Sequence, residues 1–195
     1  MKIIAASGNK AKLREIAQIF QGHEIVAMQD AGFTEEIEEN GVTFEENALI
    51  KARAVRNALH CAALADDSGL CVDALHGAPG VYSARFCGRH GDDAANNRLL
   101  LEKLNGLPES QRGAYFESCV ALVLADGREF VASGKTFGRI LFEVDGNGGF
   151  GYDPLFFSND LQKSFGTASA EEKNAVSHRG RALSLLAEKI KGETL

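Results

Sequence analysis

The spacing of hydrophobic residues predicts alternating strands and helices in the first third of the chain. An apolar run at residues 2–6 predicts a short buried strand, and residues 10–20 repeat apolar side chains with a helical period. A second strand is predicted at 25–27. Thr43-Phe44-Glu45-Glu46 has the spacing of a capping box, which predicts a helix from there to about His60.

The middle and the end of the chain continue this pattern. Residues 62–65 predict a short apolar strand that ends in Asp66-Asp67-Ser68-Gly69, and Leu70-Cys71-Val72 extends it. Asp92 or Asp93 is placed to cap the next helix, which Gly106 and Pro108 close. Ser169-x-x-Glu172 is a second capping box, and it predicts a helical C-terminal region.

A hairpin between these helical regions decides the type of sheet. Strand patterns at 114–124 and 128–133 flank Asp126-Gly127, a strong hairpin signal, and a separate strand is predicted within 137–144. A purely parallel sheet would not contain that hairpin. We therefore expect an α/β fold with a mixed central sheet flanked by helices. No repeat or linker is evident, so residues 1–195 are expected to form a single domain.

Composition and charge narrow the class of protein. Hydrophobic residues make up 45% and charged residues 25% of the chain, values of an ordinary globular protein. The formal net charge of −6 argues against a general nucleic-acid binder, which needs a positive surface. We expect neither a signal peptide nor a membrane span. The four cysteines form no C-x-x-C pair, so we expect reduced, mostly buried thiols in a cytoplasmic protein.

Two glycine patterns imitate phosphate-binding motifs. Gly146-Asn147-Gly148-Gly149-Phe150-Gly151 matches G-x-G-x-x-G, but a dinucleotide site needs a helix to open there, and Tyr152-Asp153-Pro154 does not look helical. Gly134-Lys135-Thr136 resembles the end of a P-loop, but Glu129 stands where the first glycine is required. Neither a nicotinamide oxidoreductase nor a P-loop enzyme is favoured.

Four short segments could carry chemistry, and each also has an ordinary structural explanation. Ser7-Gly8-Asn9-Lys10-Ala11-Lys12 suits phosphate binding at a helix N-terminus, but also a plain N-cap with solvated lysines. Asp66-Asp67-Ser68-Gly69 suits a Mg²⁺ site or a surface turn. Glu38-Glu39 could add a metal ligand or simply be solvated. Ser177-His178-Arg179-Gly180 is rich in donors, as an exposed basic helix end would be, and Gly180 is expected to interrupt the helix.

These segments belong to a larger set of blocks that occurs in one family. In chain order the blocks are Ser7-x-Asn9-x-x-Lys12, Thr43-Phe44-x-x-Asn47-Ala48-x-x-Lys51-Ala52, Ala65-Asp66-Asp67-Ser68-Gly69-Leu70, Gly77-Ala78-Pro79-Gly80-x-x-Ser83-Ala84-Arg85-Phe86, Gly148-Gly149-Phe150-Gly151-Tyr152-Asp153-Pro154 and Lys173-x-x-x-Ser177-His178-Arg179-Gly180. The set resembles the inosine triphosphate pyrophosphatase family, the non-canonical purine nucleoside triphosphate pyrophosphatases. The resemblance covers residues 3–182. Ala11 departs from it, since Gly is frequent at that position.

The resemblance implies a fold, an activity and an assembly. The fold would have two lobes with an active-site cleft between them, in a homodimer that requires Mg²⁺. The substrates would be purine nucleoside triphosphates, namely ITP, dITP and XTP. Hydrolysis between their α- and β-phosphates would give the monophosphate and pyrophosphate, which keeps deaminated purines out of nucleic acids.

The resemblance also implies residue roles. Asp67 would be the catalytic proton acceptor and a Mg²⁺ ligand, with Glu39 as a second carboxylate at the metal. The substrate contacts would be Ser7, Gly8, Asn9, Lys10, Ala11, Lys12, Ser68, Phe150, Gly151, Tyr152, Asp153, Lys173, His178 and Arg179. Because Arg179 has only hydrogen-bond donors, it could select purines that carry an acceptor at O6 over adenine.

Two other functions share many of these features. A non-catalytic nucleotide-binding module would need the phosphate and base contacts but not Asp67 at a metal. A related pyrophosphatase could act on modified pyrimidines or methylated nucleotides. The intact Asp66-Asp67-Ser68 block favours an enzyme, and the His178-Arg179 pair favours the purine family.

Overall fold

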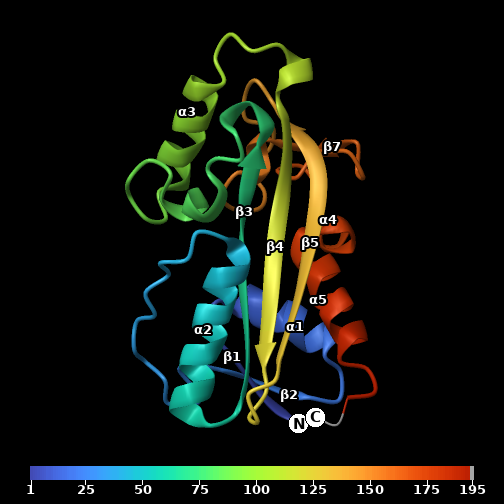
Figure 1. The fold of residues 1–195 in the computed structure, drawn as a ribbon. Helices are drawn as coiled ribbons and strands as arrows, with labels where there is room; N and C mark the ends of the chain where they lie inside the picture. Colours follow the sequence, from blue (N-terminus) through green and yellow to red (C-terminus); the bar gives the residue numbers. More distant parts are fainter. Residues whose placement is uncertain (194–195) are drawn as a thin grey trace. The chain divides into compact units, whose positions relative to one another are not determined.

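Seven strands form one mixed sheet in the order β2-β1-β3-β4-β5-β6-β7 (Figure 1). The structure is a computed structural model that describes residues 1–193, without the side chain of Ala11. β1 pairs in parallel with β2 and β3, whereas β6 pairs antiparallel with β5 and β7, so the predicted mixed sheet is confirmed. The strands are β1 Lys2–Ala5, β2 Glu24–Ala27, β3 Ala62–Val72, β4 Gly113–Val123, β5 Glu129–Ile140, β6 Phe156–Ser158 and β7 Lys163–Ser164.

The helices begin where the capping residues predict. Thr43 Oγ1 accepts a hydrogen bond from Glu46 N at 3.1 Å, and the Ser169–Glu172 capping box is complete. Glu46 departs from the prediction, because its carboxylate accepts from Val42 N rather than from Thr43 N. The α-helices are α1 Lys10–Ile19, α2 Phe44–Leu59, α3 Asp93–Lys103, α4 Ala170–Val176 and α5 His178–Lys189, and the 3₁₀ helices are η1 Asp73–Leu75, η2 Gly80–Arg85, η3 Glu109–Gln111 and η4 Asp153–Leu155.

Three local predictions were wrong. β3 ends at Val72, as the predicted extension through Leu70-Cys71-Val72 requires, but Asp66 and Asp67 lie inside the strand and not at a strand end. The predicted strands at 128–133 and 137–144 are one strand, β5, which passes through Gly134. Gly180 lies within α5, and the helical break falls instead at Ser177, whose ψ of 144° is extended. In β3 and β5, pairing within the sheet overrides a local breaker signal, and α5 continues through Gly180 despite the low helix propensity of glycine.

The chain divides into two compact units, each built from separate segments. The first unit comprises Met1–Asp67, Ser118–Gly134 and Arg179–Leu195, and the second comprises Ser68–Glu117 and Lys135–His178. β3, β4 and β5 therefore contribute residues to both. The single-domain prediction stays a prediction.

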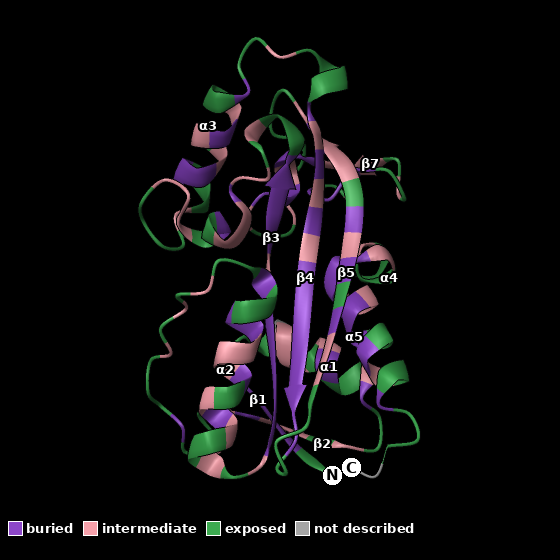
Figure 2. Ribbon diagram, viewed as in Figure 1, coloured by how far each residue is buried: buried purple, intermediate pink, exposed green. Residues whose placement is uncertain are grey.

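Alternating side chains of β1 and β3 build two cores in the first unit. Ile3 and Leu64 belong to one buried cluster, which includes residues of α1 and α5. Ile4 and Ala63 belong to another, which includes residues of α2. Because successive strand residues point to opposite faces of a sheet, these helices cover opposite faces. Figure 2 shows the buried residues concentrated along β3 and β4.

The core of the second unit is more aromatic. Phe116 packs against Phe156 with 4.7 Å between ring centroids, and Phe165 completes the group at 5.0 Å from Phe156. Leu100 of α3 and Leu104, which follows the last residue of the helix, join this cluster. No helix within residues 1–193 is long and apolar enough to cross a membrane.

Candidate active site

The alternation of β3 sends its two aspartates to opposite faces of the sheet. Asp66 continues the series of Ala62 and Leu64, which face α1 and α5, and Asp67 continues that of Ala63 and Ala65, which face α2. The contacts of the carboxylates agree with this parity. The two acidic groups are therefore adjacent in sequence but occupy different environments.

Asp66 is the centre of a buried ion-pair cluster. Its Oδ2 lies 3.0 Å from Lys12 Nζ and 3.0 Å from Arg179 Nε, and Asp66 is 4% exposed. Arg179 Nη1 also lies 3.1 Å from Glu15 Oε2. Burial by itself raises the pKa of Asp66, but the positive charges of Lys12 and Arg179 outweigh it and hold that pKa well below its usual range. Asp66 therefore stays ionised and connects α1 with α5.

Asp67 has a different set of partners, which α2 supplies. Its Oδ2 accepts a hydrogen bond from Asn47 Nδ2 at 3.0 Å, and its Oδ1 lies 3.4 Å from Lys51 Nζ. Asn47 and Lys51 are four residues apart, so they lie on one face of the helix. Burial raises the pKa of Asp67, although Lys51 and Asn47 oppose the increase. A raised pKa makes this carboxylate a better proton acceptor than an ordinary aspartate.

Glu39 joins Asp67 through the same lysine. Lys51 Nζ lies 3.0 Å from Glu39 Oε2. Burial by itself lowers the pKa of Lys51, but the negative charges of Asp67 and Glu39 oppose this, and the pKa is raised. Two carboxylates thus converge on one ammonium group. They are a donor set that Mg²⁺ accepts, since this ion uses one or two carboxylates and completes its shell with phosphates and water. No group of three or more His, Cys, Asp or Glu side chains within residues 1–193 is arranged to hold a metal ion.

The predicted phosphate segment forms the N-terminus of α1. Asn9 Oδ1 accepts from Lys12 N at 3.4 Å, and Ser7 Oγ accepts from Asn9 N at 3.1 Å. Gly8, Asn9 and Lys10 are exposed. The first turn of α1 contains no acidic residue, so the positive end of the helix and the exposed Lys10 face solvent without a local opposing charge. The side chain of Ala11 lies outside the part that the structure describes.

The glycine-rich segment of the second unit forms a tight loop that presents one aromatic side chain. Phe150 is 60% exposed, and Lys173 Nζ lies 4.4 Å from the centroid of its ring. Asp153, 2% exposed, accepts from Phe150 N at 2.8 Å and forms an ion pair with Lys173. Gly149 has a φ of +75°, and an added Cβ would lie 2.2 Å from Asp153 Oδ2. The 3₁₀ helix η4 follows, which agrees with the rejection of a dinucleotide-binding motif.

Tyr152 and His178 are buried in the second unit. Tyr152 is 4% exposed and its hydroxyl donates to Ser83 O at 2.9 Å, while burial raises the pKa of the phenol. His178 begins α5, and its ring stacks on Phe116 with 5.1 Å between centroids and 15° between planes. Ser68 lies in β3 directly after Asp67.

The predicted site residues divide between the two units, and those of the first unit lie on both faces of the sheet. The group in the first unit consists of Ser7, Gly8, Asn9, Lys10, Ala11, Lys12, Glu39, Asp67 and Arg179. The group in the second unit consists of Ser68, Phe150, Gly151, Tyr152, Asp153, Lys173 and His178.

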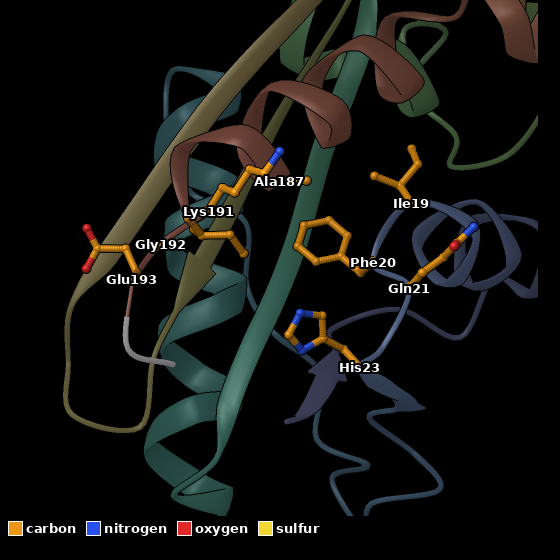
Figure 3. Close-up of a pocket in the computed structure, with 9 residues that line it drawn as sticks. Ile19, Phe20, Gln21, His23, Ala187, Lys191, Gly192 and Glu193 are labelled. Carbon is orange, nitrogen blue, oxygen red and sulfur yellow. The ribbon is translucent and has the colours of Figure 1, made fainter.

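The cavity drawn in Figure 3 lies in the first unit, at the ends of α1 and α5. Its volume is about 310 Å³, and its walls include Phe20, His23 and Ile190. None of the predicted site residues is among the described residues that line it. We assign it no part in the site.

Comparison with known families identifies the chain. A family model described as the Ham1 family matches residues 3–189. The chain belongs to the Ham1 family. The predicted resemblance is thereby confirmed, and the blocks from Ser7 to Gly180 all lie within the matched range.

Individual Ham1-family proteins are similar over nearly their whole length. A dITP/XTP pyrophosphatase from Clostridium perfringens is 45% identical and covers 98% of both chains. One from Geobacter sulfurreducens is 49% identical over 95% of this chain and 94% of its own. The solved structure of the Staphylococcus aureus Ham1 protein has a TM-score of 0.92 at 38% identity and covers 100% of both chains.

The sequence analysis assigned no role to four charged or polar residues that contact Asp67 or Arg179. Asp67 depends on Asn47 and Lys51, and Arg179 depends on Asp66 and Glu15. The signal for the first two was the spacing Asn47-x-x-x-Lys51 on a predicted helix, which places both on the same face. No local signal marked Glu15, because its partner lies 164 residues away along the chain.

Proposed function

We propose that this protein hydrolyses ITP, dITP and XTP to the nucleoside monophosphate and pyrophosphate. The observation that carries the proposal is the 45–49% identity to dITP/XTP pyrophosphatases over nearly the whole chain. The enzyme is a hydrolase that acts on an acid anhydride. Its role would be to clear deaminated purines from the nucleotide pool.

The residues of the first unit suit the triphosphate end of the substrate. The N-terminus of α1, with Ser7 to Lys12, supplies backbone N–H groups and two lysines for phosphate oxygens. Asp66 keeps Lys12 within a buried ion pair, which limits the orientations of that side chain. The positive end of the helix and the exposed Lys10 would offset part of the negative charge of the triphosphate.

Asp67 and Glu39 would hold Mg²⁺, which agrees with the convergence of both carboxylates on Lys51. When bound, the ion would neutralise charge on the phosphates and on the leaving pyrophosphate. Phosphoryl transfer needs little covalent chemistry from the protein, so positioning and charge matter most.

Asp67 would also accept the proton of the attacking water. The water oxygen forms a bond to the α-phosphorus. The bond between that phosphorus and the oxygen that bridges to the β-phosphate breaks, and pyrophosphate leaves with the electron pair. Lys51 and Asn47 fix the orientation of the carboxylate.

The residues of the second unit suit the base. The exposed ring of Phe150 offers a stacking surface, and stacking accepts any purine. Lys173 lies over that ring and provides a donor that an acceptor at O6 could use. Arg179 is less suited than Lys173 to select purines by O6, because its Nε and Nη1 already contact Asp66 and Glu15.

Other features of the family stay predictions. These are the homodimer, the cleft between two lobes and the cytoplasmic location. Sedimentation equilibrium at micromolar concentration is expected to give about twice the chain mass of 20.9 kDa, and a monomer throughout that range would contradict the dimer.

Product analysis tests the proposed function. The protein would be incubated with Mg²⁺ and ITP, dITP, XTP, ATP, GTP, a modified pyrimidine triphosphate or a methylated nucleotide, and products separated by chromatography. IMP and pyrophosphate are expected from ITP, at a rate far above that with ATP. IDP and inorganic phosphate would overturn the mechanism, preference for a modified pyrimidine or methylated nucleotide would favour the related pyrophosphatase, and binding without turnover would favour a non-catalytic module.

A further inference from the structure

The backbone of Gly151 is held by two side chains of α3. Asp93 Oδ2 accepts a hydrogen bond from Gly151 N at 2.8 Å, and Asn97 Nδ2 donates one to Gly151 O at 2.9 Å. Asp93 and Asn97 are four residues apart and therefore neighbours on one helix face. Together they bind the donor and the acceptor of one residue that lies 58 and 54 positions further along the chain.

These bonds have no role in starting α3. The N-cap of the helix is Asp92, whose Oδ1 accepts from Ala95 N at 3.0 Å, so Asp93 is not needed as a cap. Asn97 Oδ1 is buried and has no hydrogen-bond partner within residues 1–193. An amide that leaves a buried acceptor unpaired is oriented by its donor, and that donor points at Gly151 O.

The two hydrogen bonds from Asp93 and Asn97 form a clamp on Gly151, and the residues on either side of Gly151 show what this clamp positions. On one side, Phe150 N is held by Asp153, and on the other the Tyr152 hydroxyl is held by Ser83 O. Gly151 has a φ of +60°, a left-handed conformation that glycine adopts without strain. The segment is therefore restrained by hydrogen bonds at successive residues, while the Phe150 ring stays exposed.

We propose that Asp93 and Asn97 are positioning residues that place the Phe150 ring for purine binding. The inference rests on the proposed function, in which the ring of Phe150 stacks on the base. A ring held in its bound orientation loses less conformational entropy when substrate stacks on it. The clamp acts on affinity for the base and leaves the phosphate end of the site unchanged.

The test compares substitutions that remove each bond with ones that keep it. Asp93→Ala and Asn97→Ala are each expected to raise KM for ITP about 3- to 10-fold, the equivalent of one hydrogen bond, with kcat within about twofold. Asp93→Asn retains an acceptor oxygen and is expected to restore KM to within about twofold of the unmodified protein. Asn97→Asp places a carboxylate against Gly151 O and is expected to raise KM more than Asn97→Ala.

A ligand without a base separates positioning from general damage. Inhibition by inorganic tripolyphosphate, which contacts only the phosphate end, is expected to be unchanged in all four variants. Arg98→Ala, an exposed substitution on the same helix, is the matched control and should alter neither constant. Thermal unfolding identifies any variant that fails to fold, in which case Asp93→Asn and Asn97→Asp carry the comparison.

Each outcome decides the proposal. If KM for ITP in Asp93→Ala and Asn97→Ala equals that of Arg98→Ala, the clamp does not position the base site. A parallel loss of tripolyphosphate inhibition would also overturn it, since the effect would then be structural. Failure of the unmodified protein to hydrolyse ITP would instead overturn the proposed function, so the two failures are distinguishable.

Discussion

Asp66 and Asp67 are consecutive residues of β3 whose carboxylates bind opposite layers of the first unit. Asp66 pairs with Lys12 and Arg179 on one face, and Asp67 contacts Asn47 and Lys51 on the other. Asp66 is ionised and connects two helices, whereas Asp67 has a raised pKa and lies near the carboxylate of Glu39. The two aspartates should therefore respond differently to substitution.

Asp67→Asn is expected to reduce kcat for ITP by about 10²–10⁴-fold, the usual effect of losing a general base, and further if Mg²⁺ binding also weakens. The substitution keeps the shape of the side chain, so substrate binding should survive better than turnover. Steady-state kinetics and a binding measurement check both parts. If the variant folds and keeps most of its rate, Asp67 is not the proton acceptor.

Asp66→Ala is expected to lower the free energy of unfolding by about 3–5 kcal/mol, because it leaves Lys12 and Arg179 without their buried partner. Urea denaturation measures the change. Asp126→Ala, which removes a carboxylate paired with Arg128 on the surface, is the control and should leave stability nearly unchanged. Equal effects of the two substitutions would show that the buried cluster adds no special stability.

Arg179→Ala is expected to reduce kcat/KM for ITP and ATP together, by about 10- to 100-fold, because displacement of Asp66 and Lys12 disturbs the phosphate end. The ratio between the two substrates should stay within about twofold. Glu188→Ala, an exposed substitution on the same helix, provides the control. A collapse of the ITP-to-ATP ratio would instead support direct reading of the base by Arg179.

Removal of divalent ions with EDTA is expected to abolish activity, and Mg²⁺ should restore it. In Glu39→Gln the Mg²⁺ concentration for half-maximal rate is expected to rise at least about tenfold, since a ligand charge is lost. Glu38→Gln changes the adjacent exposed carboxylate and should behave like the unmodified protein. Identical Mg²⁺ titrations for both variants would remove Glu39 from the metal site.

Much of the fold could be predicted from local patterns. Apolar periodicity located β1, α1 and β4, and the capping residues Thr43, Asp92 and Ser169 located the starts of three helices. These signals are short-range, because a cap or a helical period involves residues within a few positions. Glycine was a misleading signal for the end of an element, because the course of the chain at these positions depends on more than the neighbouring residues. Gly134 and Gly180 interrupt the sequence pattern, but β5 and α5 continue through them.

The sequence by itself determined the family, through its ordered blocks of residue types, and the mixed sheet, through the hairpin signal at Asp126-Gly127. Only the tertiary structure decided which partner each side chain meets. Strand parity turns Asp66 toward Arg179, and α3 brings Asp93 to the backbone of Gly151. Such pairings join residues far apart in the chain, and no local pattern contains them, because they follow from how helices pack against a sheet.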